Sequence, residues 1–284
     1  MTILKFIKTS KSCSLVLIVI ILLSIHTAPA DEIKKKRVKI LDSSIAYREG
    51  GQGNTVLFIH GTPTSSYLWR NILPEMAESN HVIAIDLIGH GDSGKPFIEY
   101  RLKDHVKYLD EFIKSLELEN ITLVLHDWGS VVGFIYASTH PDNIAGMAFI
   151  KAMLGPVSDK SRMPEIALQM RESEGWKMIV NDNFSLENIM PMMSMVPLSK
   201  KSIYAYKKPF QETESRRALR MWPLEVPIAG HPEDNYKIFS IYAKYLTASK
   251  VPKLLMYSTP GVLIDEKSAL LVEQAFENIK VETI

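Results

Sequence analysis

Short continuous apolar runs alternate with amphipathic segments along most of this chain. The segment 101–118 has apolar residues three and four positions apart, which is typical of a helix with one buried face. The segment 65–79 predicts another helix, capped by Ser65 or Ser66. Each continuous run predicts a strand buried on both faces: TVLFIH at 55–60, HVIAIDLIG at 81–89 and IAGMAFIKA at 144–152. Buried strands that alternate with helices imply an α/β fold with a mostly parallel sheet between layers of helices.

The hydrophobic pattern changes between residues 153 and 248. Strand signals stop there, and the helical segments are interrupted by prolines, which indicates an inserted helical cap. A hairpin is expected at 38–51, before the buried strands. After the cap, the sequence predicts a strand at 251–259, a helix at 267–276 and a last strand at 279–284. We therefore assign the predicted core to residues 31–152 and 249–284, and the cap to 153–248.

The first 30 residues have the pattern of a targeting segment. Three lysines precede the apolar run Leu15 to Ile25, and Ala28-Pro29-Ala30 follows. This order is typical of a signal peptide cleaved after Ala30, so we expect a secreted or periplasmic protein. The basic run from Lys34 to Lys39 resists translocation and favours the alternative, an uncleaved N-terminal membrane anchor.

Composition excludes several classes of function. The net charge is +1, and it becomes −2 without residues 1–30, which contain three lysines and no acidic residue. This balance gives no basic surface for nucleic acid. The one cysteine, Cys13, lies in the targeting segment, so the mature chain has no disulfide. We expect no metal and no other cofactor, and the only membrane contact would come from an uncleaved N-terminal segment.

The segment ITLVLHDWGSVVGFIYAS at 121–138 predicts a strand, a tight turn and a helix, with Asp127 in the turn. The dipole and free N–H groups of the helix N-terminus favour an ionised carboxylate there. Such a carboxylate is a suitable nucleophile for displacement at a saturated carbon that carries a leaving group. Expected oxyanion donors are the backbone N–H groups of Trp128 and of Thr62, which follows the strand at 55–60. The alternative role for Asp127 is a helix N-cap.

At these residues the chain resembles the α/β-hydrolase fold, and within it the haloalkane dehalogenases. The matching segments are HGTPTSSYLWRNILP, DLIGHGDSGKP, LHDWGSVVGF, EVPIAG and PKLLMYSTPGVLI. The resemblance implies that Asp127 displaces halide from a small apolar halogenated substrate and that water then hydrolyses the ester. It implies that the indole N–H of Trp128 holds the halide, with a packed aromatic ring beneath the cap as the alternative. Motif match places four residues in the substrate pocket: Pro223, Val226, Val262 and Leu263.

Three positions depart from the pattern of this family. Thr62 stands where many dehalogenases have an Asn that donates to the halide. No acid occupies the place after the strand at 144–152, which reads Lys151-Ala152-Met153, and Asp265 is better explained as a helix cap. The histidine base follows the last strand in the family, whereas this sequence ends at Ile284, so we expect a C-terminally truncated chain. The eight histidines at 26, 60, 81, 90, 105, 126, 140 and 231 are all better explained as structural.

These departures lead to a specific hypothesis about turnover. Displacement needs only Asp127 and a halide donor, but hydrolysis of the ester needs an activated water. The chain is therefore expected to be alkylated once and to stay alkylated. Two alternatives stay open. An epoxide hydrolase would aim two cap tyrosines at the substrate, and Tyr204 and Tyr206 are the candidates. A non-catalytic binding protein on a hydrolase scaffold would explain the lost base and acid.

Overall fold

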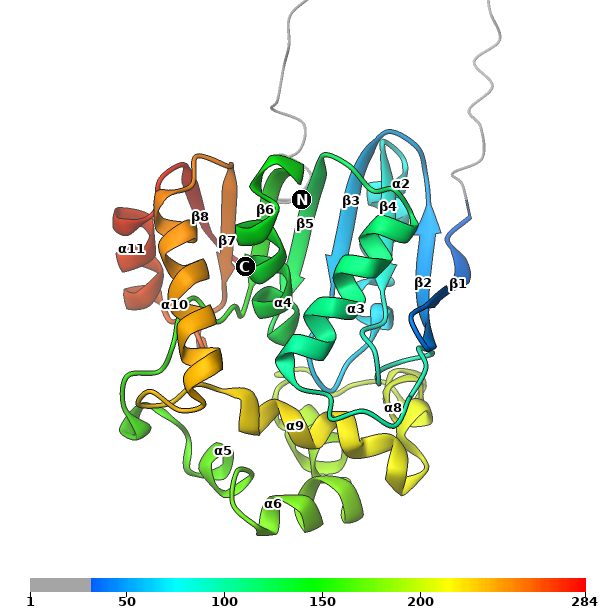
Figure 1. Ribbon diagram of the computed structural model, residues 1–284, viewed down its shortest axis with the longest axis vertical. Coiled ribbons are helices and arrows are strands. Elements are labelled where there is room, and N and C mark those ends of the chain that lie inside the picture. The colour runs from blue at the N-terminus through cyan, green and yellow to red at the C-terminus, as the bar shows by residue number, and fades with distance from the viewer. Residues whose placement is uncertain (1–31) are drawn as a thin grey trace, which may run out of the picture.

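The computed structural model describes residues 32–284, so the predicted signal peptide lies outside the described residues. A single sheet has the strand order β1-β2-β4-β3-β5-β6-β7-β8 (Figure 1). β2 runs antiparallel to β1 and β4, and all the other neighbouring pairs are parallel. The strands are β1 (Lys34–Ile40), β2 (Ser43–Gly50), β3 (Asn54–Ile59), β4 (Asn80–Ile85), β5 (Ile121–His126), β6 (Ile144–Ile150), β7 (Lys253–Tyr257) and β8 (Ile279–Thr283).

The central strands are buried on both faces, as the continuous apolar runs predict. In β3, Leu57 and Ile59 belong to a core shared with α3, α4 and α10, whereas Val56 and Phe58 pack on the opposite face with α2. The helices flanking the sheet are α2 (Leu73–Ala77), α3 (Leu102–Ser115), α4 (Trp128–Thr139), α10 (Glu233–Ala248) and α11 (Glu266–Ala275). This arrangement confirms the predicted mostly parallel sheet with helices on both faces.

Helix boundaries agree with the capping signals in the sequence. The predicted helix at 65–79 is broken into a short 3₁₀ turn, Ser66–Trp69, and α2, and Ser65 caps the turn by accepting from the Tyr67 N–H. Asp265 caps α11, because its Oδ1 accepts from the Ser268 N–H at 2.8 Å. The interpretation of Asp265 as a cap rather than a catalytic acid is therefore confirmed.

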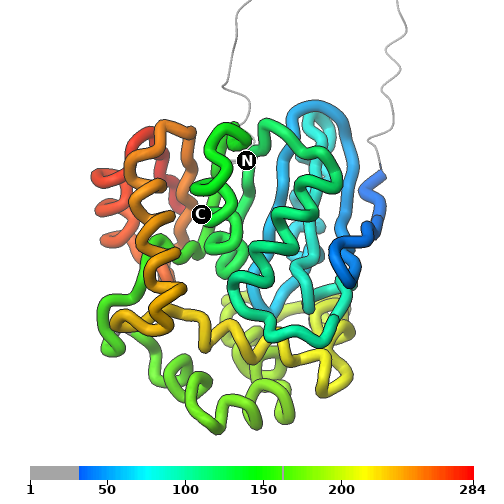
Figure 2. The backbone as a smooth tube through the Cα atoms, in the orientation of Figure 1, coloured from blue at the N-terminus to red at the C-terminus, as the bar shows by residue number. Residues whose placement is uncertain are grey.

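Short helices fill the stretch between β6 and β7. Figure 2 shows the chain leaving the sheet after β6, crossing beneath the strand ends and returning through α10. Residues 233–248 fall inside the range predicted for the cap, but they form α10, which packs against α4 beside the sheet. The helices before α10 are α5 (Glu165–Gln169), α6 (Glu174–Trp176), α7 (Met190–Met192), α8 (Lys200–Lys207) and α9 (Arg217–Glu225).

The basic run of the sequence forms β1, an edge strand whose first four side chains are exposed. Lys35 pairs with Asp92 at 2.7 Å and Lys36 with Glu49 at 2.5 Å. Charged edge strands are a common way to prevent pairing with another chain. Within the described part of the chain, no helix has the length and apolar character that crossing a bilayer requires.

Three histidines are buried, His60, His90 and His105, and His126 at the end of β5 is partly buried. Burial removes the charged imidazolium from water, and this desolvation lowers the pKa of all four. The pKa falls to about 3 for His105 and to about 4 for His126. These side chains are therefore neutral at neutral pH.

Acid should unfold the protein partly through these groups. An unfolded His105 takes up a proton near its ordinary pKa of 6.5, but the folded one does so only near 3. Stability is therefore lost as the pH falls from 6.5 towards 3, with a slope of up to about 1.4 kcal/mol per pH unit for each such group. We expect His105→Phe to flatten the dependence of the free energy of unfolding on pH, as measured by urea unfolding across this range. The exposed His231 supplies the control, because His231→Gln should leave the slope unchanged. A His105→Phe curve parallel to that of the wild type would contradict the explanation.

Candidate active site

Asp127 occupies the turn between β5 and α4 with φ 54° and ψ −129°. Positive φ is unfavourable for a residue with a side chain, so the surrounding structure must hold this conformation. Gly129 allows α4 to approach β3 closely, because a Cβ there would lie 2.4 Å from the carbonyl oxygens of Ile59 and His60. The Ser130 hydroxyl donates to the Asp127 carbonyl at 2.5 Å and accepts from the Met153 N–H at 3.1 Å. The turn is thus fixed from β3 on one side and from the end of β6 on the other.

The Asp127 carboxylate is nearly buried and is held by one backbone donor. The Thr62 N–H donates to Asp127 Oδ1 at 3.1 Å. The side chain makes no capping hydrogen bond to α4, which removes the support for a purely structural N-cap role. Among residues 32–284, no hydrogen-bond donor contacts Oδ2. One oxygen is therefore oriented by the predicted oxyanion donor, and the other is available for attack.

A cavity of about 240 Å³ lies over this carboxylate, between the strand ends and the cap. Predicted pocket residues Pro223, Val226 and Leu263 line it. Val262 does not: it is 73 % exposed, because in the turn after β7 its neighbour Leu263 takes the inward position. That prediction was wrong. The lining is mostly apolar and rich in thioethers: Thr62, Pro63, Asp127, Trp128, Met153, Val157, Met163, Ala167, Met170, Ser185, Ile189, Met193, Leu219, Trp222, Pro223, Val226 and Leu263.

Two indole rings meet in this cavity, and their N–H groups have different partners. The Trp222 N–H donates to His90 Nε2 at 3.1 Å. Trp128 packs against Trp222 with ring centroids 4.6 Å apart, yet no acceptor within the described chain takes its N–H. An indole can only donate, so Trp128 offers an unused donor to an anion in the cavity. The sequence motifs did not predict Trp222 as a pocket residue, although it directly precedes Pro223, which they did predict.

Thr62 reaches the cavity, but its hydroxyl is directed towards His90. Thr62 Oγ1 lies 3.5 Å from His90 Nε2, the atom that already accepts from Trp222. A hydroxyl is shorter than the carboxamide of an asparagine, so it approaches a bound anion less closely. The contribution of Thr62 that the geometry supports is its backbone N–H on the nucleophile.

None of the buried histidines contacts the carboxylate. His60 Nδ1 lies 2.7 Å from the Gly61 carbonyl oxygen, and its Nε2 accepts from the Leu87 N–H at 3.0 Å. The His126 ring lies beside Trp69, with centroids 6.4 Å apart, on the far face of the sheet. The lowered pKa of each ring also makes it a weak base at neutral pH. Neither ring is therefore positioned to activate a water at this carboxylate.

The two candidate tyrosines of an epoxide hydrolase do not converge on the cavity. Tyr204 is 60 % exposed, whereas Tyr206 is buried against Tyr67 with ring centroids 5.4 Å apart. Neither residue lines the cavity. Tyr204 and Tyr206 are two residues apart on α8, and side chains at this spacing on a helix point in different directions.

Comparison with known proteins places this geometry in a family. The family profile described as the alpha/beta hydrolase fold matches residues 54–179. A haloalkane dehalogenase from Mesorhizobium japonicum is 38 % identical over 253 residues, which cover 86 % of this chain and 80 % of that protein. One from Sphingobium indicum UT26 is 38 % identical over 240 residues, covering 81 % of each chain. This chain belongs to the haloalkane dehalogenase family.

Solved structures of the dehalogenases agree with this assignment. The crystal structure of the haloalkane dehalogenase DbeA from Bradyrhizobium elkani USDA94 superposes with a TM-score of 0.87 at 37 % identity, covering 89 % of this chain and 90 % of that one. The structure of a putative ancestral haloalkane dehalogenase gives a TM-score of 0.85 at 40 % identity, covering 87 % and 89 %.

Lys151 lies beside the cavity and departs from the pattern of the family. It follows β6 directly, where one subgroup of the family carries an acid, and its φ is 50°. Lys151 Nζ lies 3.4 Å from the sulfur of Met193, which lines the cavity. A cation thus stands at the edge of the cavity where an anion is expected.

The close approach of α4 to β3 generates a stability prediction. Gly to Ala inside a helix normally stabilises by up to about 1 kcal/mol. At Gly129 the new Cβ would collide with two backbone oxygens, so we expect Gly129→Ala to lower the free energy of unfolding by at least about 2 kcal/mol. One turn along α4, the three atoms nearest to a Cβ at Gly133 all belong to the Leu125 side chain, which can move. Gly133→Ala should therefore change stability by less than about 1 kcal/mol in the same urea titration. Equal losses in the two variants would contradict the proposed contact.

Proposed function

We propose that this chain cleaves the carbon–halogen bond of small apolar haloalkanes through an ester on Asp127. The observation that carries the proposal is a half-satisfied carboxylate beneath an apolar cavity, beside an indole N–H that has no acceptor in the described chain. An apolar cavity with few convergent polar groups suits a small apolar ligand. The family to which the chain belongs supports the same chemistry.

The displacement step requires only the Asp127 carboxylate, the haloalkane and a donor to the departing halide. Asp127 Oδ2 attacks the carbon that carries the halogen, the carbon–oxygen bond forms, and the halide leaves with the bonding electrons. The Trp128 N–H donates to the developing halide, which strengthens this contact in the transition state. Oδ1 becomes the carbonyl oxygen of the ester and keeps its hydrogen bond to the Thr62 N–H.

Hydrolysis of that ester requires an activated water, and it depends on a base that contacts the site. Among residues 32–284, no imidazole contacts the Asp127 carboxylate, and Lys151 stands at the expected position of an acid. We therefore propose that the 284-residue chain accumulates the alkyl ester. The other candidate is a non-catalytic binding protein that uses the same cavity, and the two differ in whether Asp127 becomes alkylated.

Intact-mass measurement tests the ester directly. After incubation with 1-bromobutane, we expect one butyl group per chain and one equivalent of released bromide, with the adduct mapped to Asp127. Asp127→Ala removes the nucleophile and should give no adduct. A wild-type chain that binds the bromoalkane but gains no mass would reject the ester mechanism and favour the binding protein.

Trp128→Phe isolates the proposed halide donor. Losing a hydrogen bond to a developing charge costs about 1.5–3 kcal/mol, so adduct formation should slow by roughly 10- to 100-fold. Trp222→Phe is the matched control, because the Trp222 N–H is already bound to His90. It should slow the reaction by less than roughly threefold. A larger effect at Trp222 than at Trp128 would show that Trp222, and not Trp128, contacts the halide.

A further inference from the structure

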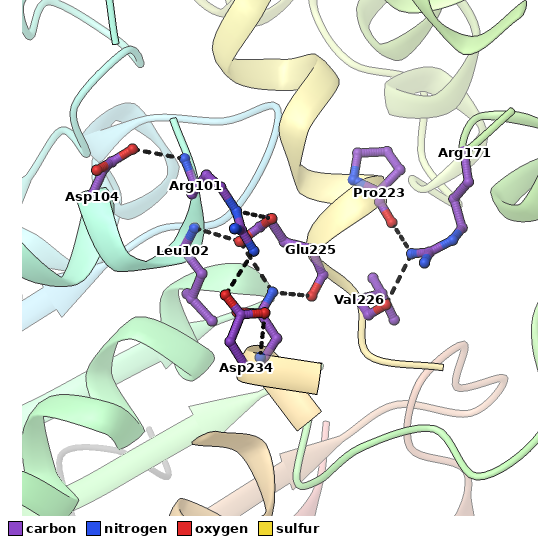
Figure 3. A network of polar contacts seen from close by, with 9 residues as sticks. Arg101, Leu102, Asp104, Arg171, Pro223, Glu225, Val226 and Asp234 are labelled. Carbon is purple, nitrogen blue, oxygen red and sulfur yellow. Dashed lines mark hydrogen bonds and ion pairs between the residues drawn. The ribbon is translucent and has the colours of Figure 1, made fainter. Parts of the chain in front are cut away.

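Two arginines of the cap, one after α5 and one on α9, each bind the end of the other's helix. Arg171 follows α5, and its Nη1 donates to the carbonyl oxygens of Pro223 and Val226, the latter at 2.9 Å, at the C-terminal end of α9 (Figure 3). Arg220 lies on α9 and donates to carbonyl oxygens just beyond α5: that of Met170 at 3.0 Å and that of Glu172 at 3.2 Å. We name Arg171 and Arg220 the arginine clasp.

The acceptors explain how these cations remain buried. Arg220 is 7 % exposed, Arg171 is partly buried, and no salt bridge within residues 32–284 pairs either one with a carboxylate. Desolvation lowers the pKa of both groups. The carbonyls at a helix C-terminus carry partial negative charge and lack partners in the helix, so a guanidinium satisfies them and is stabilised in return. The clasp therefore joins two helix ends by charge-assisted hydrogen bonds.

The clasp closes tightly around the turn after α5. A Cβ added at Gly175 would lie 2.1 Å from the Met170 carbonyl oxygen and 3.2 Å from the guanidinium carbon of Arg220. Only a glycine fits this place without displacing either the carbonyl or the arginine that binds it.

Residues on both sides of the clasp form walls of the cavity. The α5 side contributes Met163, Ala167 and Met170, and α9 with its end contributes Leu219, Trp222, Pro223 and Val226. Three of the carbonyls that the arginines bind belong to lining residues: Met170, Pro223 and Val226. The distance between the walls is therefore tied to these hydrogen bonds.

A second network attaches α9 to the core, so that the clasp has a fixed side. Glu225 is buried and accepts from Arg101 Nε at 2.9 Å and from the Leu102 N–H at 2.7 Å, at the start of α3. Asn235 of α10 also donates to Glu225 Oε2, at 3.0 Å. Figure 3 shows Arg101 bonded to both Glu225 and Asp234, with Arg171 on the other side of the α9 end. α9 is held by the core, and α5 is held by α9.

We propose that Arg171 and Arg220 are positioning residues that set the width of the cavity and thereby select haloalkanes by bulk. This inference rests on the proposed function. With the clasp intact, the α5 wall stays close to α9 and favours a slender, unbranched substrate. Without it, the α5 wall loses its attachment and moves outward. A slender substrate then loses contacts, whereas a bulky substrate gains room.

The test compares adduct formation on Asp127 for 1-bromobutane and bromocyclohexane. We expect Arg171→Met and Arg220→Met to shift the ratio of the two rate constants towards bromocyclohexane by roughly fivefold or more. Arg216→Met is the matched control: Arg216 also lies in the cap and donates to the carbonyls of Val180, Phe210 and Gln211, none of which lines the cavity. Its ratio should stay within roughly twofold of the wild type. Equal slowing of both substrates, or the same shift in Arg216→Met, would overturn the proposal.

Two further measurements cover variants that do not fold and a chain that forms no adduct. If the Met variants do not fold, Arg171→Lys and Arg220→Lys retain the cation but not the planar pair of donors, and they should shift the same ratio partially. Binding of the unreactive 1-butanol and cyclohexanol, followed by tryptophan fluorescence, reports cavity width without any chemistry. A wild-type chain that forms no adduct while the clasp variants change the alcohol preference rejects the proposed function and leaves the clasp supported. An unchanged alcohol preference in the clasp variants rejects the proposal that the clasp sets the width of the cavity.

Discussion

The close contact between β3 and the start of α4 is the constraint on which the site depends. It places the Thr62 N–H, at the end of β3, within 3.1 Å of a carboxyl oxygen of Asp127. Asp127 has a positive φ in the turn that begins α4, and Gly129 lets the helix approach the backbone oxygens of Ile59 and His60 at the end of β3. The proposed nucleophile, Asp127, and the proposed oxyanion donor, the Thr62 N–H, are therefore oriented by main-chain geometry. Such preorganisation needs no further rearrangement during the reaction.

The aromatic rings that pack above Asp127 differ in the hydrogen bonds that their N–H groups make. His90 is neutral because burial lowers its pKa, so its Nε2 can accept the Trp222 N–H. His105 stacks on the other side of Trp222, with centroids 4.1 Å apart, and fixes the plane of that ring. Trp128 packs against Trp222 and keeps its own N–H for the cavity. His90 and His105 thus hold Trp222 in place beside the cavity.

Local signals in the sequence were enough to predict the sheet, the turn at Asp127 and the donor Thr62. Each depends on a short segment with its own periodicity or turn chemistry. Val262 was placed wrongly, because the side on which a turn residue projects is set by the chain around it. The arginine clasp could not be predicted, since its acceptors are carbonyls about 50 residues away that any residue type would supply. The position of α10 beside α4 likewise depends on packing between distant segments.

The departures from the family pattern fall on groups that act through side chains, and this explains why they leave the nucleophile intact. Thr62 keeps the backbone N–H that contacts Asp127, although its side chain differs from the asparagine of many relatives. Lys151 replaces an acid at the end of β6, but the turn is supported there by Ser130 and the Met153 N–H instead. In the proposed displacement step, the strand ends, the turn and one indole act, and these groups are separate from the side chains that differ from the family pattern. The proposed loss of turnover therefore concerns hydrolysis of the ester, whereas the proposed first step keeps all its groups.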